Sequence, residues 1–187
     1  STLAQLLLHM YEPQKGMICF DGIPINKIDI QWLRLQVSYV PQDVFLFSET
    51  VSNNIRFGID GATDELVRSA ATQASIHNEI EKFSSGYRTM IGERGVTLSG
   101  GQKQRISIAR ALIKDPRIVI FDDCLSAVDA RTEKEIISNL YRYLEDKTAV
   151  IITHRIFSLF EFDRIIVIDD GRIAEQGTHQ QLLEQKG

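Results

Sequence analysis

The stretch Ile118-Val119-Ile120-Phe121-Asp122-Asp123, four apolar residues followed by two acids, decides the fold. An apolar run of this length just after Asp115-Pro116 is typical of a strand buried inside a parallel sheet. Comparable short strands are predicted at residues 37–40, 149–152 and 164–168, with helical periodicity between them. This alternation predicts an α/β fold, a mostly parallel sheet with helices on both faces.

The middle third of the chain is predicted to be helical. Residues 63–83 carry apolar positions at helical spacing, and a glycine-containing loop over 84–98 separates them from a helix that begins near Ser99. Asp170-Gly171, between two apolar segments, predicts a hairpin that adds an antiparallel edge to the sheet. Ile106, Ala109 and Ile113 mark the buried stripe of the helix that begins near Ser99, which is expected to end before Asp115-Pro116. Further helices are predicted at residues 3–10, 30–35, 136–144 and 156–160.

The composition is that of an ordinary globular protein, with 43% hydrophobic and 25% charged residues among 187. A net charge of −4 offers no basic footprint, so we expect no nucleic-acid partner. No apolar run reaches the ~18 residues that span a bilayer, so the chain itself is not expected to cross one. Cys19 and Cys124 lack metal-ligand spacing, and we expect two small buried hydrophobes in a reducing compartment. Because the chain opens in mid-pattern at Ser1, we expect it to continue upstream.

Polar residues follow several predicted strands, where open α/β sheets bind their ligands. Asp122-Asp123 follows residues 118–121, Thr153-His154 follows residues 149–152, and Pro41-Gln42 follows residues 37–40. Taken alone, paired acids after a strand are more often turn or cap residues than catalytic groups. Because the carboxyl ends of parallel strands lie at one edge, these residues could share a single site.

Leu98-Ser99-Gly100-Gly101-Gln102 stands at the start of a predicted helix. Two glycines there let backbone amides approach an anion, and the helix dipole favours negative charge, so a phosphate could dock. The alternative is a simple serine N-cap with flexible glycines. Lys103 and Arg105, further along the helix, are expected to lie on its solvated face.

Together these motifs resemble the nucleotide-binding domain of ABC transporters. The resemblance covers essentially the whole chain and follows the family's order. Residues 93–95 and the Phe45–Phe57 segment also look like the exporter branch, where such stretches meet the coupling helices of membrane domains. The matching motifs are the Q-loop glutamine Gln42, the signature Leu98–Gln102, the Walker B strand Ile118–Asp122, the D-loop Ser126–Asp129 and the switch histidine His154.

The resemblance implies a RecA-like P-loop NTPase core with an inserted helical signature subdomain and an antiparallel edge hairpin near the C-terminus. We expect one domain divided into core residues 1–49, helical subdomain residues 50–114 and core residues 115–187. Ser1-Thr2 looks like the end of the P-loop, whose glycines and lysine are absent from these 187 residues. The fragment alone is therefore expected to bind ATP poorly and to be inactive.

The resemblance also implies ATP and Mg²⁺ as cofactors and a role for each matched residue. Asp123 and His154 are expected to be catalytic and Asp129 to contact the partner domain of a head-to-tail dimer. The signature is expected to cap ATP bound on that partner. The expected magnesium ligands are Ser1, Gln42 and Asp122, and the expected phosphate-binding residues are Ser1, Thr2, Gln42, Ser99, Gly100, Gly101 and Gln102.

The function so implied is that of an ATP-hydrolysing motor of an exporter, coupled to transmembrane domains at the cytoplasmic face of the cell membrane. One residue departs from the pattern: Asp123 stands where the family usually has glutamate as general base. Aspartate is one methylene shorter, which favours the degenerate half of a heterodimeric exporter. The alternatives are a homodimer in which Asp123 still serves, a regulatory module without useful turnover, and a soluble ABC ATPase of DNA repair or translation.

Overall fold

The computed structural model describes residues 2–92, 96–124, 130–154 and 162–185. The chain divides into two compact units, Ser1–His154 and Arg155–Gly187. Each unit has its own sheet structure and is described by itself.

A three-stranded parallel sheet is the centre of the first unit. Its order is β3 (Val37–Val40), β4 (Ile118–Asp122) and β5 (Thr148–Ile152). Val119 and Ile120 of β4 are fully buried, because this strand has a neighbour on each side and helices above and below. The three strands and the parallel arrangement predicted from the apolar runs are confirmed.

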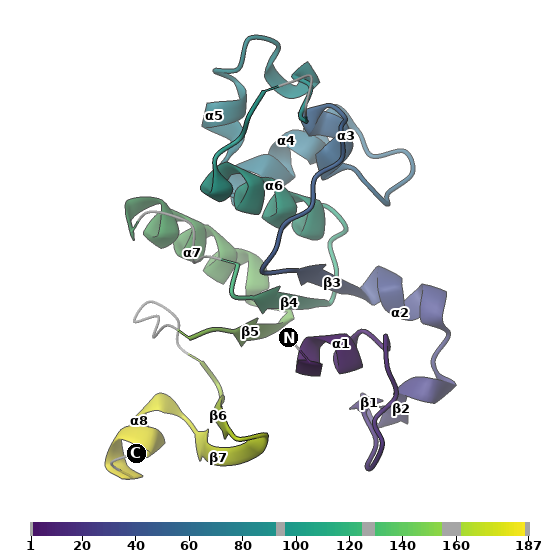
Figure 1. Ribbon diagram of the computed structural model, residues 1–187, viewed down its shortest axis with the longest axis vertical. Helices are drawn as coiled ribbons and strands as arrows, with labels where there is room; N and C mark the ends of the chain where they lie inside the picture. The colour runs from purple at the N-terminus through teal and green to yellow at the C-terminus, as the bar shows by residue number, and fades with distance from the viewer. Residues whose placement is uncertain (1, 93–95, 125–129, 155–161, 186–187) are drawn as a thin grey trace. The chain divides into compact units, whose positions relative to one another are not determined.

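Helices cover both faces of this sheet (Figure 1). On one face, α1 (Thr2–Leu7) and α2 (Ile30–Gln36) contribute Ala4 and Leu33 to a buried cluster with Val37 and Ile120. On the other face lie α6 (Gly100–Leu112) and α7 (Ala130–Leu144). Along α7 the side chains of Ile136, Leu140 and Leu144 are buried, as the four-residue spacing predicts.

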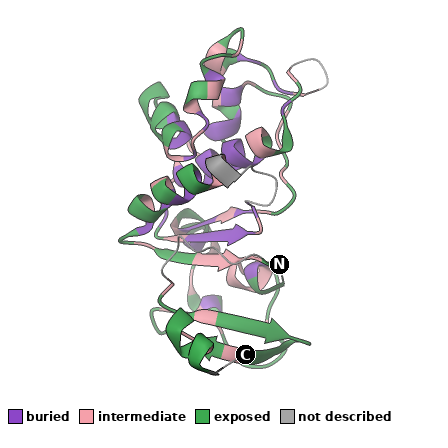
Figure 2. Cartoon of the chain, turned by 90° about the vertical axis from the view of Figure 1, so that its left-hand side faces the viewer, coloured by how far each residue is buried: buried purple, intermediate pink, exposed green. Residues whose placement is uncertain are grey.

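A helical region lies between β3 and β4 in the sequence. It contains α3 (Val51–Ile55), α4 (Asp64–Gln73), α5 (His77–Ile80) and the 3₁₀ turn η2 (Gly86–Arg88), and it packs on α6. Threonine side chains cap two of these helices, Thr50 for α3 and Thr63 for α4. The prediction that this third of the chain is helical is confirmed for its main elements, with isolated bridges at Thr50–Met90 and Ile91–Val96 in addition. Figure 2 shows the buried residues on the packed sides of these helices.

A short hairpin follows α1 in the first unit. It consists of β1 (Cys19–Phe20) and β2 (Ile23–Pro24), joined by Asp21-Gly22 in left-handed conformations and followed by the 3₁₀ turn η1 (Ile25–Lys27). Cys19 is exposed on this two-stranded ribbon, so the expectation that it is buried was wrong. Its neighbours Ile18 and Phe20 pack against the buried cluster, so strand alternation leaves Cys19 on the opposite, exposed face. Cys124 is buried, as predicted.

The second unit contains a hairpin and a helix. Strands β6 (Ile165–Asp169) and β7 (Arg172–Gly177) pair antiparallel, and α8 (His179–Gln185) follows. Asp170 and Gly171 both have positive φ, 44° and 71°, as a tight hairpin of right-twisted strands requires. The predicted hairpin is confirmed, and the helix predicted at residues 156–160 lies outside the described residues.

Across the ranges that the structure describes, every helix is too short or too polar to cross a bilayer.

Candidate functional site

Asp122 ends β4, and its carboxyl group is held by a tyrosine from the neighbouring strand. It is only 2% exposed and, by strand alternation, lies on the same face as Ile118 and Ile120, the face that α1 covers. The Tyr39 hydroxyl donates a hydrogen bond to Asp122 Oδ2 at 2.9 Å. Burial, together with this hydrogen bond and the carboxylate charge, raises the pKa of Tyr39 to about 12. The phenol therefore stays a donor at neutral pH and orients the carboxylate.

Asp123 lies just beyond the strand and has left the strand conformation. Its φ is +46°, in the left-handed region, where aspartate is tolerated better than most residues. Its amide donates to Ile152 O at 2.8 Å, which ties the turn to β5. Gln42 Nε2 donates to Asp123 Oδ2 at 3.4 Å. The two acids of the opening motif thus have separate surroundings, one buried against Tyr39 and one half-buried beside Gln42.

The residues predicted from the three strand ends are brought to one edge of the sheet. Gln42 lies two residues beyond β3, and the hydrogen bond to Asp123 links it to the end of β4. Thr153 and His154 follow β5, whose last residue, Ile152, pairs with Asp122. His154 is exposed at this edge. Parallel register thus carries Gln42, the two acids and His154 to the carboxyl edge, as the sequence predicted.

Thr2 begins α1, whose Ala4 packs on the sheet face that carries Asp122. Three of the predicted elements lie outside the described residues: Ser1, the D-loop with Asp129, and residues 93–95.

The side chains at this edge suit Mg²⁺. Asp122 and Gln42 offer carboxylate and amide oxygens, the hard donors that Mg²⁺ prefers. Within the described part of the chain, no cluster of three His, Cys, Asp or Glu residues forms a closed metal cage. Such a sparse set fits an ion that takes most of its ligands from water and substrate phosphates.

The predicted phosphate-binding segment is the N-terminus of α6. Ser99 is the N-cap: its Oγ accepts from Gln102 N at 3.2 Å, and Gln102 Oε1 accepts from Ser99 N at 2.9 Å. This capping box confirms the predicted helix start. The next two residues, Gly100 and Gly101, belong to the first turn. Their amides have no partner within the helix, and neither residue has a Cβ that would shield them.

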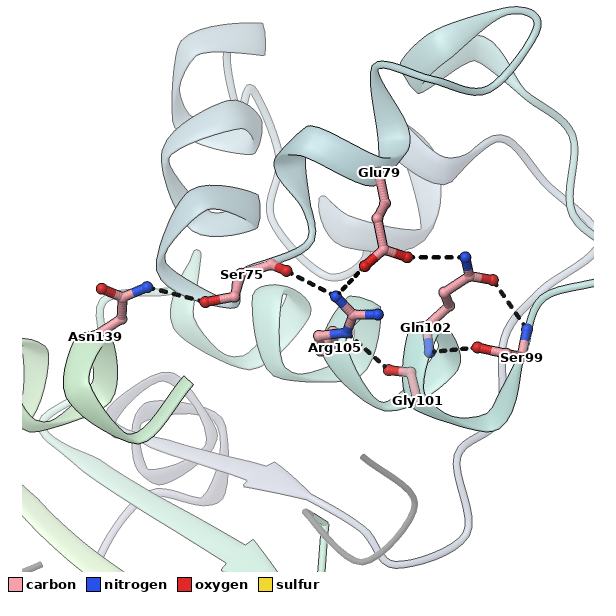
Figure 3. A network of polar contacts seen from close by, with 7 residues as sticks. All are labelled: Ser75, Glu79, Ser99, Gly101, Gln102, Arg105 and Asn139. Carbon is pink, nitrogen blue, oxygen red and sulfur yellow. Dashed lines mark hydrogen bonds and ion pairs between the residues drawn. The ribbon is translucent and has the colours of Figure 1, made fainter. Parts of the chain in front are cut away.

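Sequence reasoning missed the environment of Arg105, which was expected to face solvent. Its side chain is 8% exposed and forms an ion pair with Glu79 of α5 (Figure 3), so that expectation was wrong. The spacing did contain a signal, because Arg105 lies four residues before Ala109 on the buried side of α6. Lys103 is exposed, as predicted.

A second buried polar residue that sequence reasoning did not identify, Asn54, fixes the segment after Gln42. Asn54 of α3 is fully buried: its Oδ1 accepts from Phe47 N at 2.9 Å, and its Nδ2 donates to Phe47 O at 3.0 Å. Arg110 of α6 donates to Asn54 O at 2.7 Å and to Phe45 O at 3.0 Å. Burial lowers the pKa of Arg110, which also lies over the Phe47 and Phe57 rings. The far end of the signature helix is thus bonded to the Phe45–Phe57 segment.

Comparison with known proteins agrees with this geometry. The family model described as "ABC transporter" matches residues 1–126. The chain is 50% identical over all its 187 residues to a probable multidrug resistance ABC transporter ATP-binding/permease protein, YheI, of Bacillus subtilis, and covers 32% of it. It is 43% identical to the mitochondrial iron-sulfur clusters transporter atm1 of Neurospora crassa, covering 100% of this chain and 27% of that protein.

A solved structure of a bacterial Atm1-family ABC exporter with ATP bound superposes with a TM-score of 0.94 at 44% identity, over 100% of this chain and 33% of that one. The fold and the site define an ABC-type ATPase domain, with exporters among its relatives. The chain belongs to the ABC transporter family. It spans about a third of the length of the relatives it matches.

Proposed function

We propose that this chain is the ATP-hydrolysing motor domain of an ABC exporter. The observation that carries the proposal is the edge formed by Asp122, Asp123, Gln42 and His154 at the ends of three parallel strands. Phosphoryl transfer to water needs positioned oxygen ligands for magnesium, a base for the water and a donor toward the γ-phosphate. These four side chains supply all three.

The residues take distinct roles in the proposal. Asp122 with Gln42 and Ser1 would hold Mg²⁺, which when bound neutralises charge on the β- and γ-phosphates. Thr2, beside Ser1, would contact phosphate at the start of α1. Tyr39 keeps the Asp122 carboxylate in one orientation through its 2.9 Å hydrogen bond. Asp123 would accept the proton of the attacking water, and His154 would donate a hydrogen bond to the γ-phosphate.

The partner is a second nucleotide-binding domain arranged head to tail. In this arrangement Ser99, Gly100, Gly101 and Gln102 face ATP held by the partner, and Asp129 contacts that domain. The Phe45–Phe57 segment would receive the coupling helices of the transmembrane domains; Phe45 and Phe57 are 68% and 52% exposed, which leaves apolar surface for such a contact. The motor then works at the cytoplasmic face of the cell membrane.

These 187 residues alone are expected to hydrolyse little ATP. They contain Ser1-Thr2 from the end of the P-loop but not its glycines and lysine. Without those groups the amide cradle and the positive charge over the β- and γ-phosphates are missing.

A second candidate function follows from Asp123 itself. Its side chain is shorter than the glutamate usual in the family, and its left-handed backbone and the contact from Gln42 constrain where the carboxylate can reach. A misplacement of about 1 Å can cost roughly a hundredfold in rate. The chain would then be the catalytically weak half of a heterodimer. Its own signature would still serve the ATP site of the partner.

The test is steady-state ATPase activity of the full-length protein purified without a partner, as wild type and as Asp123→Glu, in saturating Mg-ATP. A motor competent by itself turns over as wild type and gains less than threefold from glutamate. A degenerate half is nearly silent as wild type and gains tenfold or more. Silence of both proteins, with or without candidate partner chains, would refute ATP hydrolysis at this site.

A further inference from the structure

Glu79 holds two side chains of the signature helix with its two carboxylate oxygens (Figure 3). Its Oε1 accepts from Arg105 Nη1, and its Oε2 accepts from Gln102 Nε2 at 2.9 Å. Both partners belong to the first turns of α6, whereas Glu79 comes from α5, more than twenty residues earlier in the chain. One acidic side chain therefore connects two helices at the point where α6 begins.

The contact decides which way the Gln102 amide points. A carboxylate only accepts hydrogen bonds, so Glu79 draws Nε2 of Gln102 toward itself and leaves Oε1 facing the Ser99 amide. The bond from the Ser99 amide to Gln102 Oε1 is the reciprocal half of the capping box. Glu79, which lies outside α6, thus orients the side chain that closes the capping box.

Arg105 also connects the first turns of α6 to Glu79 of α5. Its Nε donates to Gly101 O at 3.2 Å, and its Nη1 donates to Ser75 O at 2.8 Å as well as to Glu79. Burial alone would raise the pKa of Glu79, but the hydrogen bonds from Arg105 and Gln102 outweigh it and hold the pKa below its usual value. The carboxylate is therefore ionised at neutral pH and balances a buried cation.

The network extends to the helix that follows β4. Asn139 Nδ2 of α7 donates to Ser75 Oγ at 2.9 Å. Ser75, which has a φ of +53°, ends the turn after α4 and presents its carbonyl to Arg105. The signature turn is thereby fixed against both the helical region and α7.

We propose that Glu79 is a positioning residue that holds Ser99, Gly100 and Gly101 in the geometry that closes on ATP bound to the partner domain. This inference rests on the proposed function, in which the signature acts across the dimer. In this proposal Glu79 itself would make no contact with nucleotide. It acts through Gln102 and Arg105, so its loss leaves ATP docking on the P-loop intact and slows the step that needs the closed dimer.

The experiment measures kcat and KM for Mg-ATP in the intact transporter, with Glu79→Gln, Glu79→Asp and a matched control, Glu81→Gln. Glu81 lies two residues further along and pairs with Arg68 at the surface. We expect Glu79→Gln to lower kcat at least tenfold with KM changed less than threefold. Glu79→Asp keeps the charge and recovers at least a third of the rate, and Glu81→Gln stays within twofold of wild type. Thermal unfolding of each variant confirms that it is folded at the assay temperature.

Two results would overturn the inference. The first is a kcat of Glu79→Gln within twofold of wild type. The second is a loss of kcat that is equally large in Glu79→Asp and that parallels a fall in the unfolding temperature of the variants. A Gly101→Asp variant separates this failure from failure of the proposed function. If Gly101→Asp abolishes turnover and Glu79→Gln does not, the signature works without Glu79. If Gly101→Asp leaves turnover unchanged, the proposed role of the signature is wrong, and the inference with it.

Discussion

Cys124 shows at the scale of one residue how the end of β4 sets side-chain chemistry. Its thiol is 2% exposed, directly after the two acids of the site. Burial, with the charges of Asp123 and Asp122 adding to it, raises the pKa of Cys124 to about 12. Because the thiolate is the reactive form, this cysteine is chemically protected although it adjoins the candidate site. Cys19 is exposed on the β1–β2 ribbon and offers a contrast.

The two thiols should differ sharply in alkylation by iodoacetamide at pH 8. We expect Cys19 to react within minutes and Cys124 at least a hundredfold more slowly, because burial excludes the reagent and the raised pKa leaves almost no thiolate at that pH. Mass spectrometry of time points measures both rates in one sample. In the Cys19→Ser variant fast labelling disappears, and in denaturant both cysteines of the wild type react. Fast labelling of Cys124 in the folded chain would contradict the buried environment.

At the scale of elements, α6 joins two segments to which the proposal assigns functions. Its first turn carries the signature, and near its other end Arg110 donates to Asn54 O and, through Nη2, to Asn54 Oδ1 at 2.9 Å. Asn54 in turn bonds to both backbone groups of Phe47. A buried amide with this many partners fixes the path of the segment after Gln42, since its loss would leave partly buried backbone groups of Phe47 without this partner.

Replacing Asn54 by alanine should therefore destabilise the domain by about 1 to 3 kcal/mol, because it removes the partners of the Phe47 N–H and C=O and of Arg110 Nη2, all partly buried. The matched control is Asn53→Ala, since Asn53 is exposed and its Nδ2 bonds to the Glu49 side chain at 3.1 Å. A change below ~0.5 kcal/mol is expected there. Urea unfolding of the purified domain measures both. Equal effects at positions 53 and 54 would refute the structural role of Asn54.

At the scale of the whole molecule, the proposed function has the chain contribute to two composite sites. In that proposal Asp122, Asp123 and His154 would act on ATP held by this chain's own P-loop, while the signature would act on ATP held by the partner domain. The two contributions lie on different parts of the first unit, β4 with its neighbours and the N-terminus of α6. In a heterodimer, a substitution that inactivates the residues at the end of β4 would leave the signature able to act at the partner's ATP site, and the reverse.

This asymmetry predicts unequal effects in the intact transporter with its partner. If Asp123 marks the slow site, Gly101→Asp lowers the ATPase rate more than thirtyfold, because an acid at the signature repels the phosphates of ATP bound to the partner domain. Asp123→Asn then costs much less, under threefold, because that site contributes little turnover. Steady-state phosphate release measures both variants. Comparable losses from the two substitutions would point instead to a symmetric dimer in which Asp123 serves as base.

Much of this arrangement was predictable from sequence because its causes are local. The apolar run before Asp122 predicts a buried strand, the Asp170-Gly171 pair predicts the hairpin, and Ser99 followed three residues later by Gln102 predicts a helix start. Parallel strands end at one edge, so the grouping of Gln42 with the paired acids followed from topology alone.

Tertiary structure decided the contacts between residues far apart in the chain. Tyr39 bonds to Asp122 across 83 positions, Arg110 to Asn54 across 56 and Arg105 to Glu79 across 26. No local periodicity specifies which buried charge meets which carboxylate, and Arg105 resembles a solvated residue in the sequence because the three residues before it, Gln102, Lys103 and Gln104, are polar. The sequence by itself thus determined the main strands and helices and the edge where the candidate site lies, because hydrophobic period and turn chemistry act over a few residues. Packing decided what orients each side chain, because a buried polar group must find its partner wherever the fold brings one.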